Sequence, residues 1–537
     1  MISGGKKTIC MLREPPGAPD LPTRRSVLQS AAAGALVAGA GLGAGGVPGA
    51  ARAQTATDLV VEFATVDDPD FPIRTYNGNT PGPTLRVNAG KALRVNLFNR
   101  LPAETAEEFC PENQNTLHAN NTTNFHTHGL HVSPYKSEDM QFDADNIFLS
   151  VVPKDQEVPD RCDTADLRRV EAQFSFELPP GHPPGTFWYH AHKHGSTALQ
   201  VTQGLAGPLI VNDPQDHMPP YIENAREDVF LLQRRNLSAE NPGGELTMVR
   251  AFPDGGGEMN PVIRMRPGEV RRWRFINAAP SADAFVSLNF QDAGGITPEV
   301  WQIAFDGLTF DARRRVEFRG GDPWEDPASL APGNRTDFMI RIPRGAPAGR
   351  LRLLASQPRL ELLHEVDSFA SRPIEMTVIV GGDPVDDDWS QDDWLPGPGL
   401  EPIGRAGAIE RKVEFGFDEA GGFAIDGKKF NGEVKEPKMK RDSVGEWTVT
   451  NVTGVTHPFH IHVNPFFITH IQGEELDVDD PRRRWQDTIA LPAAGETGDG
   501  EIRFLTRFET FTGKFVIHCH ILRHEDTGMM QAVEVIA

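Results

Sequence analysis

Positive charge is scarce in this sequence. The 537 residues contain 53 Lys and Arg against 75 Asp and Glu, which gives a formal net charge of −22. A surface this acidic repels nucleic acid and anionic lipid, so neither is expected as a partner. It is better suited to small neutral or cationic partners.

Cysteine is also scarce, with only Cys10, Cys110, Cys162 and Cys519. Cys110 and Cys162 belong to one acidic insertion. They either form a disulfide in an oxidising compartment or remain two free thiols, because a sequence does not give their separation. Cys519 lies between two histidines and is considered separately as a possible metal ligand.

A long apolar run is missing even where a membrane anchor would be expected. The Ala/Gly-rich stretch that ends near residue 50 is rich in glycine and contains Pro48, which disfavours a stable membrane span. Before it, Thr-Arg-Arg-Ser-Val-Leu at 23–28 resembles a twin-arginine export signal, and Ala-Arg-Ala at 51–53 is typical of a cleavage site. We therefore predict that residues 1–53 are a signal segment for the twin-arginine export machinery, and that the protein is periplasmic or secreted.

Helical periodicity is scarce as well, and short alternating segments bounded by Gly, Pro and Asn predict an all-β protein. One strand pattern occurs three times, led by Gly90, Gly268 and Gly445 at nearly equal intervals and ending each time at an asparagine. Such spacing favours three copies of one β domain, each a Greek-key barrel or sandwich. Pro-rich and acidic segments predict the boundaries: a first domain at 54–215, a second at 216–390 and a third at 391–537.

The predicted middle domain has almost no histidine. Of 17 histidines, only His364 lies between His217 and His457. Most of the others fall in four short clusters: His126 and His128; His190 and His192; His457, His460 and His462; and His518 and His520, which flank Cys519 and precede His524 and Met529. His131, His182 and His194 lie beside the clusters. They either support the ligands by hydrogen bonds or are merely local, and the local interpretation is favoured.

The spacing of the residues within these clusters determines which side chains can bind the same metal. On a strand, residues i and i+2 face the same way, about 6.5 to 7 Å apart, so a His-x-His pair reaches two neighbouring metals or grips one. Cys519 then faces away from His518 and His520. One strand can thus hold one metal through sulfur and others through imidazole.

One thiolate, two imidazoles and a weak axial thioether are typical of a blue-copper site. Cys519, His524 and Met529 supply three of these ligands, and His457 supplies the fourth because its odd spacing from His460 can turn it to the other face. Zinc also accepts Cys and His, but a structural zinc site needs no eight-histidine cluster beside it.

The four clusters resemble those of the three-domain multicopper oxidases, the laccase and copper-efflux oxidase group. Asn77-Gly78 and Pro-Gly-Pro-Thr at 81–84 also resemble that family's first-domain signature. The resemblance implies three cupredoxin-like domains, the middle one without copper ligands, and four copper ions: one type 1, one type 2 and two type 3. It also implies these ligand sets: His126 and His460 for type 2; His128, His190 and His520 for one type 3 copper; His192, His462 and His518 for the other.

The implied activity is the one-electron oxidation of a small-molecule or metal-ion donor coupled to the reduction of O2 to water. Electrons are expected to enter near His457 and to cross through Cys519. The resemblance makes Glu525 a candidate proton donor and Asp145 a second candidate acid, with a solvated carboxylate as the alternative for each.

The absence of a dense methionine run in the third domain favours phenols or aromatic amines over Cu(I) as donors. The alternatives are a metallo-oxidase of Cu(I) or other metal ions in copper tolerance, a copper nitrite reductase, and a non-catalytic copper-binding protein.

Overall fold

The computed structural model describes residues 56–537 apart from 163, 215–217, 292–294, 317–325, 327, 357–373, 388, 390–394, 396, 398–399, 401–402 and 496–499. The predicted signal segment at 1–53 lies outside the described residues. Within them, no helix is both long and apolar enough to cross a membrane.

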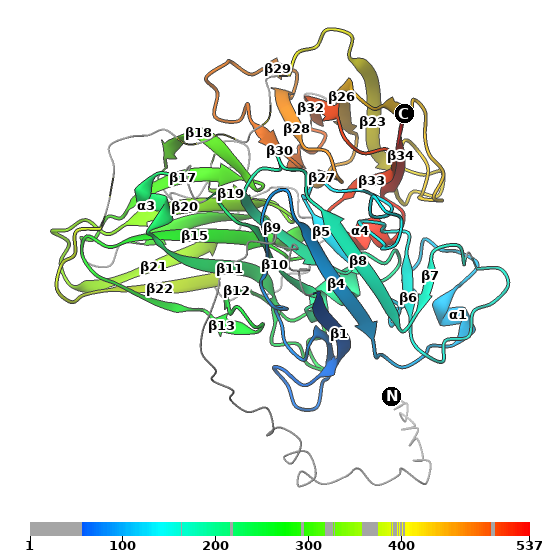
Figure 1. Ribbon diagram of the computed structural model, residues 1–537, viewed down its shortest axis with the longest axis horizontal. Helices are drawn as coiled ribbons and strands as arrows, with labels where there is room; N and C mark the ends of the chain where they lie inside the picture. The colour runs from blue at the N-terminus through cyan, green and yellow to red at the C-terminus, as the bar shows by residue number, and fades with distance from the viewer. Residues whose placement is uncertain are drawn as a thin grey trace, which may run out of the picture. The chain divides into compact units, whose positions relative to one another are not determined.

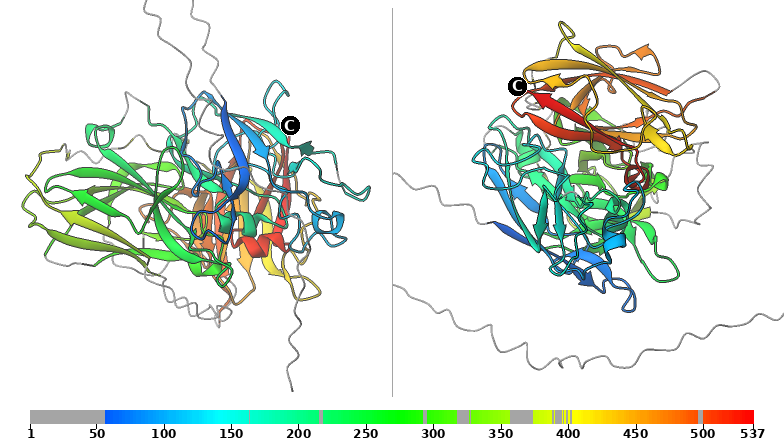
Figure 2. Two further views of the ribbon diagram at one scale, coloured as in Figure 1. Left: turned by 90° about the horizontal axis from the view of Figure 1, so that it is seen from below. Right: turned by 90° about the vertical axis from the view of Figure 1, so that its right-hand side faces the viewer.

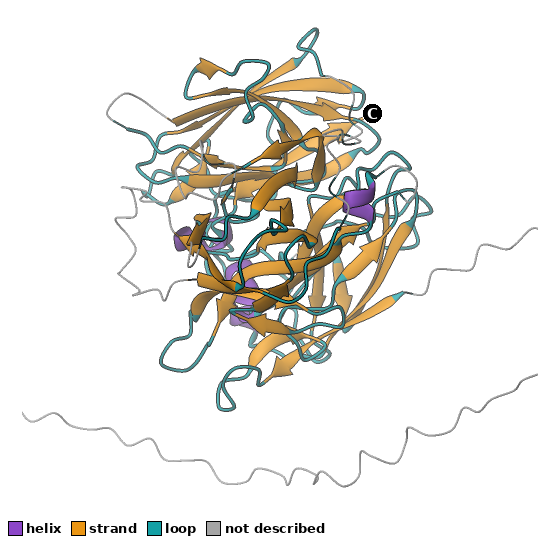
Figure 3. Cartoon of the chain, turned by 90° about the vertical axis from the view of Figure 1, so that its left-hand side faces the viewer, coloured by secondary structure: helices purple, strands orange, loops and turns teal. Residues whose placement is uncertain are grey.

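The described residues are mainly strands joined by loops, with a few short helices (Figure 3). This confirms the all-β prediction. The strands fall into three stretches of chain, called here the first (56–214), middle (218–389) and last (403–537) stretch. They can be followed in Figures 1 and 2 from blue, through green, to red. No described sheet mixes strands from different stretches.

The first stretch forms two four-stranded sheets, β2-β1-β4-β8 and β3-β10-β9-β5, and a small β6-β7 pair. Its elements are β1 (Thr57–Ala64), β2 (Ile73–Tyr76), β3 (Leu85–Val87), β4 (Ala92–Asn99), α1 (Ala106–Phe109), β5 (His126–His128), β6 (Ser150–Val152), β7 (Leu167–Arg169), β8 (Glu171–Glu177), β9 (Gly185–His190), α2 (Thr197–Gln203) and β10 (Ala206–Val211).

The middle stretch forms a seven-stranded sheet, β13-β12-β11-β15-β20-β17-β18, and a five-stranded sheet, β14-β22-β21-β16-β19. Its elements are α3 (Pro220–Glu223), β11 (Arg226–Arg235), β12 (Glu245–Ala251), β13 (Gly257–Met259), β14 (Val262–Met265), β15 (Val270–Asn277), η1 (Ala282–Ala284), β16 (Val286–Gln291), β17 (Glu299–Phe305), β18 (Leu308–Arg315), β19 (Ser329–Leu330), β20 (Arg335–Arg341), β21 (Gly349–Ser356) and β22 (Ile374–Val380).

The last stretch forms a seven-stranded sheet, in which β30 pairs with β28 beside the path β24-β23-β26-β32-β28-β29, and a five-stranded sheet, β25-β34-β33-β27-β31. Its elements are β23 (Ile409–Phe417), β24 (Phe423–Ile425), β25 (Met439–Lys440), β26 (Ser443–Asn451), β27 (His457–Ile461), β28 (Phe466–Ile471), β29 (Glu474–Glu475), β30 (Trp485–Gln486), β31 (Thr488–Leu491), β32 (Gly500–Phe508), β33 (Gly513–Cys519), α4 (Leu522–Asp526) and β34 (Met530–Ile536).

The strand pattern that the sequence repeats is one structural unit in all three stretches. β4, β15 and β26 each lie between a parallel strand (β1, β11, β23) and an antiparallel strand (β8, β20, β32). Each ends at an asparagine whose side-chain oxygen accepts from the amide two residues later. The amide groups of Asn99, Asn277 and Asn451 donate to the carbonyls of Val151, Leu330 and Pro492 at 2.8, 3.1 and 2.8 Å. Asparagine is needed there because one side chain closes a turn and also bonds buried backbone.

Each stretch has a separate apolar core, and smaller contacts join the stretches. Trp188 of β9 packs with Val229 and Ile276 of the middle stretch, and Phe285 of the middle stretch packs into the core of the last. Apolar burial of this kind is the main stabilising term in folding. These contacts join the first and last stretches to the middle one.

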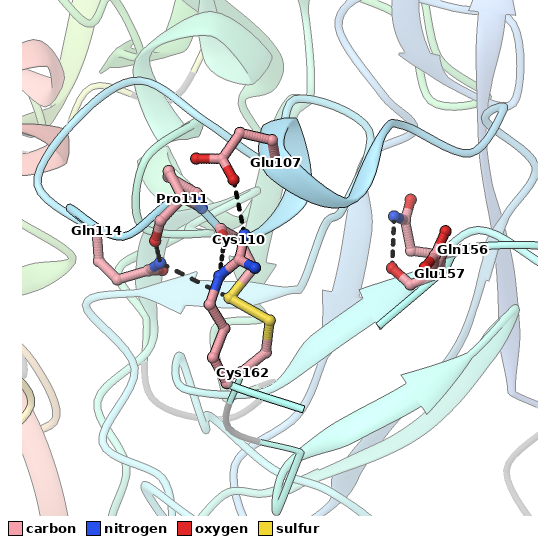
Figure 4. Close-up of a disulfide and its surroundings, with 8 residues drawn as sticks. Glu107, Cys110, Pro111, Gln114, Gln156, Glu157 and Cys162 are labelled. Carbon is pink, nitrogen blue, oxygen red and sulfur yellow. Dashed lines mark hydrogen bonds and ion pairs between the residues drawn. A yellow bond between two sulfur atoms is a disulfide. The ribbon is translucent and has the colours of Figure 1, made fainter. Parts of the chain in front are cut away.

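Cys110 and Cys162 form a disulfide, which decides the alternative that the sequence left open (Figure 4). Their Cα atoms are 6.2 Å apart. Arg161 donates to the Cys110 carbonyl at 3.0 Å through Nε and to Glu107 at 2.8 Å, so the helix end and the distant loop are also joined by polar contacts.

Candidate metal centre

Eight buried imidazoles meet between the first and last stretches. In the first, β5 pairs with β9 so that His126 is opposite His190. In the last, β27 pairs with β33 so that His460 is opposite His518. Rings from the two stretches stack in pairs, His126 on His462 at 4.0 Å and His128 on His460 at 3.9 Å between centroids. None of the eight side chains is more than 1% exposed.

The ligand atoms of these rings converge in small groups, within 4.8 Å of one another. The groups include His128 with His190 and His520; His126 with His192 and His462; His126 with His128 and His460; and His460 with His462 and His518. His518 Nε2 lies 3.2 Å from His192 Nε2 and 3.3 Å from His462 Nε2. Every histidine that the sequence analysis placed at the cluster is therefore brought together with the others.

The donor set fits metal ions. His126, His190 and His460 each use Nδ1 toward a protein oxygen, while each Nε2 is buried without a hydrogen-bond partner among the described residues. An orphaned buried nitrogen is costly unless a metal or another partner satisfies it. Burial, with the neighbouring imidazoles, holds the pKa of His126 well below its ordinary value, so the ring is neutral, the form that binds metal.

Cys519 lies on the opposite face of β33, as its parity predicted. Its Sγ is 3.3 Å from His457 Nδ1 and 3.7 Å from His524 Nδ1, and these three residues form a separate potential metal group. The Cys519 amide donates to the Met529 carbonyl at 3.1 Å, and the Met529 amide donates to the His524 carbonyl at 2.8 Å, which holds the two ligand-bearing segments together. The Met529 side chain is fully buried in the same apolar core as Cys519.

The accessible side of this group is not at His457. His457 is completely buried and its Nε2 lies 2.9 Å from Thr453 Oγ1, so a donor molecule cannot reach that ring. His524, on α4, is the partly exposed histidine of the group. The Phe423 ring lies 4.3 Å from the His524 ring and stacks on Phe417, whose side chain is 46% exposed. Of the two imidazoles beside Cys519, the His524 ring is therefore the one that a donor can approach.

Both candidate acids are buried rather than solvated. Asp145 is 3% exposed, accepts from the Thr127 amide at 2.8 Å and lies 3.0 Å from His126 Nδ1; burial raises its pKa to about 7. Glu525 is fully buried, 3.8 Å from His192 Nδ1 and 3.7 Å from His194 Nδ1. Burial, and then the neighbouring Asp526, raises the pKa of Glu525 well above its ordinary value. A buried acid that holds its proton near neutral pH is suited to proton delivery.

Sequence reasoning missed a buried ion pair beneath the cluster. Arg335, on β20 of the middle stretch, donates to both carboxylate oxygens of Asp487 at 2.7 and 2.6 Å. The Asp487 carbonyl lies 2.9 Å from His460 Nδ1. Asp306 bonds the Asp487 and Thr488 amides from the other side. The only available signal was a charged residue at an otherwise apolar strand position, which does not name its partner.

Comparison with known proteins agrees with this geometry. A multicopper oxidase family model matches residues 408–537, and a second multicopper oxidase model matches 62–108 and 164–216. The chain belongs to the multicopper oxidase family. It is similar to the multicopper oxidase mco of Staphylococcus aureus (24% identity over 478 residues, 86% of this chain and 83% of the relative). It is also similar to a laccase of Bacillus subtilis strain 168 (26% over 508 residues, 86% and 89%).

Solved multicopper oxidases share the fold. A laccase from Pediococcus acidilactici superimposes with a TM-score of 0.62 at 22% identity, covering 89% of each chain. A variant of the McoA multicopper oxidase of Aquifex aeolicus gives 0.66 at 19% identity, covering 90% of this chain and 96% of that one. The cupredoxin-like prediction is thus confirmed. This multicopper oxidase is an oxidoreductase that uses copper as cofactor, a small-molecule or metal-ion donor, and O2 as acceptor.

Proposed function

We propose that the protein oxidises phenols or aromatic amines one electron at a time and reduces O2 to water with four electrons, at four copper ions. His457, Cys519, His524 and Met529 hold the type 1 copper, and His126 and His460 hold the type 2 copper. One type 3 copper is held by His128, His190 and His520, and the other by His192, His462 and His518. The observation that carries the proposal is the position of Cys519 beside His457 and His524 while its neighbour His518 faces His192 and His462.

The protein's own residues determine the path of the electrons and the source of the protons. When bound, copper supplies one-electron redox chemistry and a place for O2 to react. Cys519 links the two groups, because its side chain belongs to one and its backbone continues directly into His518 and His520. The Glu525 carboxyl supplies a proton beside His192, and Asp145 holds His126 through Nδ1.

Two observations favour an aromatic donor over a cuprous ion. The Phe417–Phe423 pair lies beside the partly exposed His524 and offers a stacking surface. The methionines in residues 391–537, which are Met439, Met529 and Met530, are all buried, so none presents a thioether at the surface. A Campylobacter jejuni relative of the same fold is described as a metallo-oxidase, which keeps metal-ion donors as the competing class.

Metal analysis together with oxygen uptake tests the proposal. The purified holoprotein should contain about four copper ions per chain, and should consume one O2 for about four equivalents of donor without releasing peroxide. Phenols and aromatic amines should support faster uptake than Cu(I), Mn(II) or Fe(II). Fewer coppers with nitrite turnover, or bound copper without oxygen uptake, would refute it.

Glu525→Gln should slow oxygen reduction by about 100-fold or more while the blue centre is still reduced by donor at the normal rate. The amide keeps the shape of the buried side chain but has no acidic proton to give. Stopped-flow reduction under nitrogen, followed by reoxidation with O2, separates the two half-reactions. Glu509→Gln, at an exposed position, is the matched control. Normal reoxidation in the Glu525 variant would remove this residue from the mechanism.

We also propose that residues 1–53 direct twin-arginine export and that the mature enzyme is periplasmic or secreted. Replacing Arg24 and Arg25 together by Lys should retain the protein in the cytoplasm, because the signal depends on the arginine pair rather than on charge alone. Immunoblots of cell fractions measure the distribution, with Arg13→Lys as the control in the same segment. Unchanged export of the double variant would contradict the assignment.

A further inference from the structure

A small cavity lies where the middle and last stretches meet. It is partly open to solvent and has a volume of about 30 Å³, and we call it the interface cavity. Phe305 forms an apolar wall of the cavity. Its polar lining consists of Ser329 and Asn334 from the middle stretch and Arg482, Arg484, Gln486 and Thr488 from the last. A space of this size holds a small ion or a few water molecules, and no organic molecule of donor size.

Arg484 brings a positive charge to this cavity without an ion pair among the described residues. Its guanidinium lies 3.6 Å from the Phe305 ring centroid, and its Nε donates to Gln486 Oε1 at 3.0 Å. No carboxylate among the described residues forms an ion pair with it. Asp306 and Asp480 act on it only from a greater distance, and Asp480 is already paired with Arg482.

The electrostatic surroundings of Arg484 favour the binding of an anion. Burial, and then the nearby Arg314, lowers the pKa of Arg484 to about 9. The Arg484 side chain is partly buried, and a charged group that loses part of its hydration without an ion-pair partner is destabilised. An anion in the cavity would supply the missing partner.

A second, independent feature lines the same cavity. The Ser329 hydroxyl is buried in a side chain only 5% exposed, and has no hydrogen-bond partner among the described residues. Buried hydroxyl groups are nearly always bonded, so an unpartnered one that lines a cavity indicates a missing acceptor. An acceptor that also neutralises Arg484 is an anion.

We propose that the interface cavity is a binding site for a small inorganic anion, held between the Arg484 guanidinium and the Ser329 hydroxyl. The volume admits a halide or a small oxyanion. Guanidinium recognises either through charge-assisted hydrogen bonds.

The site is linked to the histidine cluster by a short series of contacts along β30 and β31. Arg484 bonds Gln486, Gln486 Nε2 donates to the Thr488 carbonyl at 3.0 Å, and Thr488 Oγ1 lies 2.9 Å from His460 Nδ1. An anion that fixes Arg484 therefore also restrains the residues that orient His460. This link to a copper ligand rests on the proposed function; the anion site itself does not.

Bromide locates the site directly. Crystals of the holoenzyme soaked in bromide should show an anomalous peak between Arg484 and Ser329. In solution, bromide should raise the melting temperature of the holoenzyme along a saturable curve. Arg484→Met, which keeps a long apolar stem, should weaken this apparent affinity by about tenfold or more.

The chain offers a matched control one residue away. Arg483 carries the same charge but lies over Phe467 and donates to the Leu476 carbonyl, and it does not line the cavity. Arg483→Met should bind bromide as the wild type does, and Arg484→Lys should keep part of the affinity. A missing bromide peak, or equal curves for Arg483→Met and Arg484→Met when both variants are folded, would overturn the proposal.

Electron paramagnetic resonance tests the link to His460. Bromide should alter the type 2 copper signal of the wild type and of Arg483→Met, but not that of Arg484→Met. Direct halide binding to copper would persist in Arg484→Met, and this result would overturn the link. A holoenzyme without any type 2 signal would instead refute the proposed function, while the bromide peak would still decide the anion site.

Discussion

Cys519→Ser is expected to abolish the blue colour of the holoprotein and to lower donor oxidation by about 1000-fold or more, equivalent to roughly 4 kcal/mol of barrier. Burial raises the pKa of this thiol well above its ordinary value, so a metal cation is needed to hold the thiolate there. Serine cannot replace the sulfur as a soft ligand. The visible spectrum and the copper content measure the outcome together.

The disulfide provides the control for this variant. Replacing Cys110 and Cys162 together by Ser removes the other cysteines of residues 54–537 and should leave the blue colour unchanged. It should lower stability by up to about 4 kcal/mol, because 52 residues separate the two cysteines. A Cys519→Ser protein that keeps its blue intensity would contradict the assignment of the thiolate to the type 1 copper.

The sequence could predict those features that depend on local spacing. A strand has a side-chain period of two, so the opposite orientations of Cys519 and His518 follow from their being neighbours, and both were found. The end of each repeated strand at Asn99, Asn277 and Asn451 could be predicted for the same reason, since a turn residue and an alternating pattern are both local signals.

Features that depend on how distant segments pack could not be predicted. His457 and His524 look equivalent as sequence letters, but only folding places the first inside the barrel and the second on a short helix at the surface. Arg335 and Asp487 are 152 residues apart and belong to different stretches. No periodicity connects them. The near absence of histidine predicts only that the middle stretch carries no copper ligand, and no local signal names Asp487 as the partner of Arg335.

This buried ion pair predicts a large effect for Arg335→Met. Burial alone would raise the pKa of Asp487, but the Arg335 guanidinium outweighs burial and holds it below its ordinary value. Without the guanidinium, Asp306 and Asp487 remain as two buried carboxylates close together. Leaving one side of a buried pair costs about 3 to 5 kcal/mol, so the free energy of unfolding should fall by that amount in denaturant titrations.

Copper content distinguishes this effect from a general loss of stability. Because the Asp487 backbone orients His460, Arg335→Met should lose the type 2 copper signal before the blue colour is affected. Arg341→Met, at the other end of β20, breaks a partly exposed pair with Glu299 and should cost less than about 1 kcal/mol with full copper content. Arg335→Lys keeps the charge but not the contact with both carboxylate oxygens. Its stability and copper content should lie between those of Arg335→Met and Arg341→Met. If Arg335→Met proves as stable and as copper-replete as Arg341→Met, the middle stretch is only a spacer and the ion pair does not position His460.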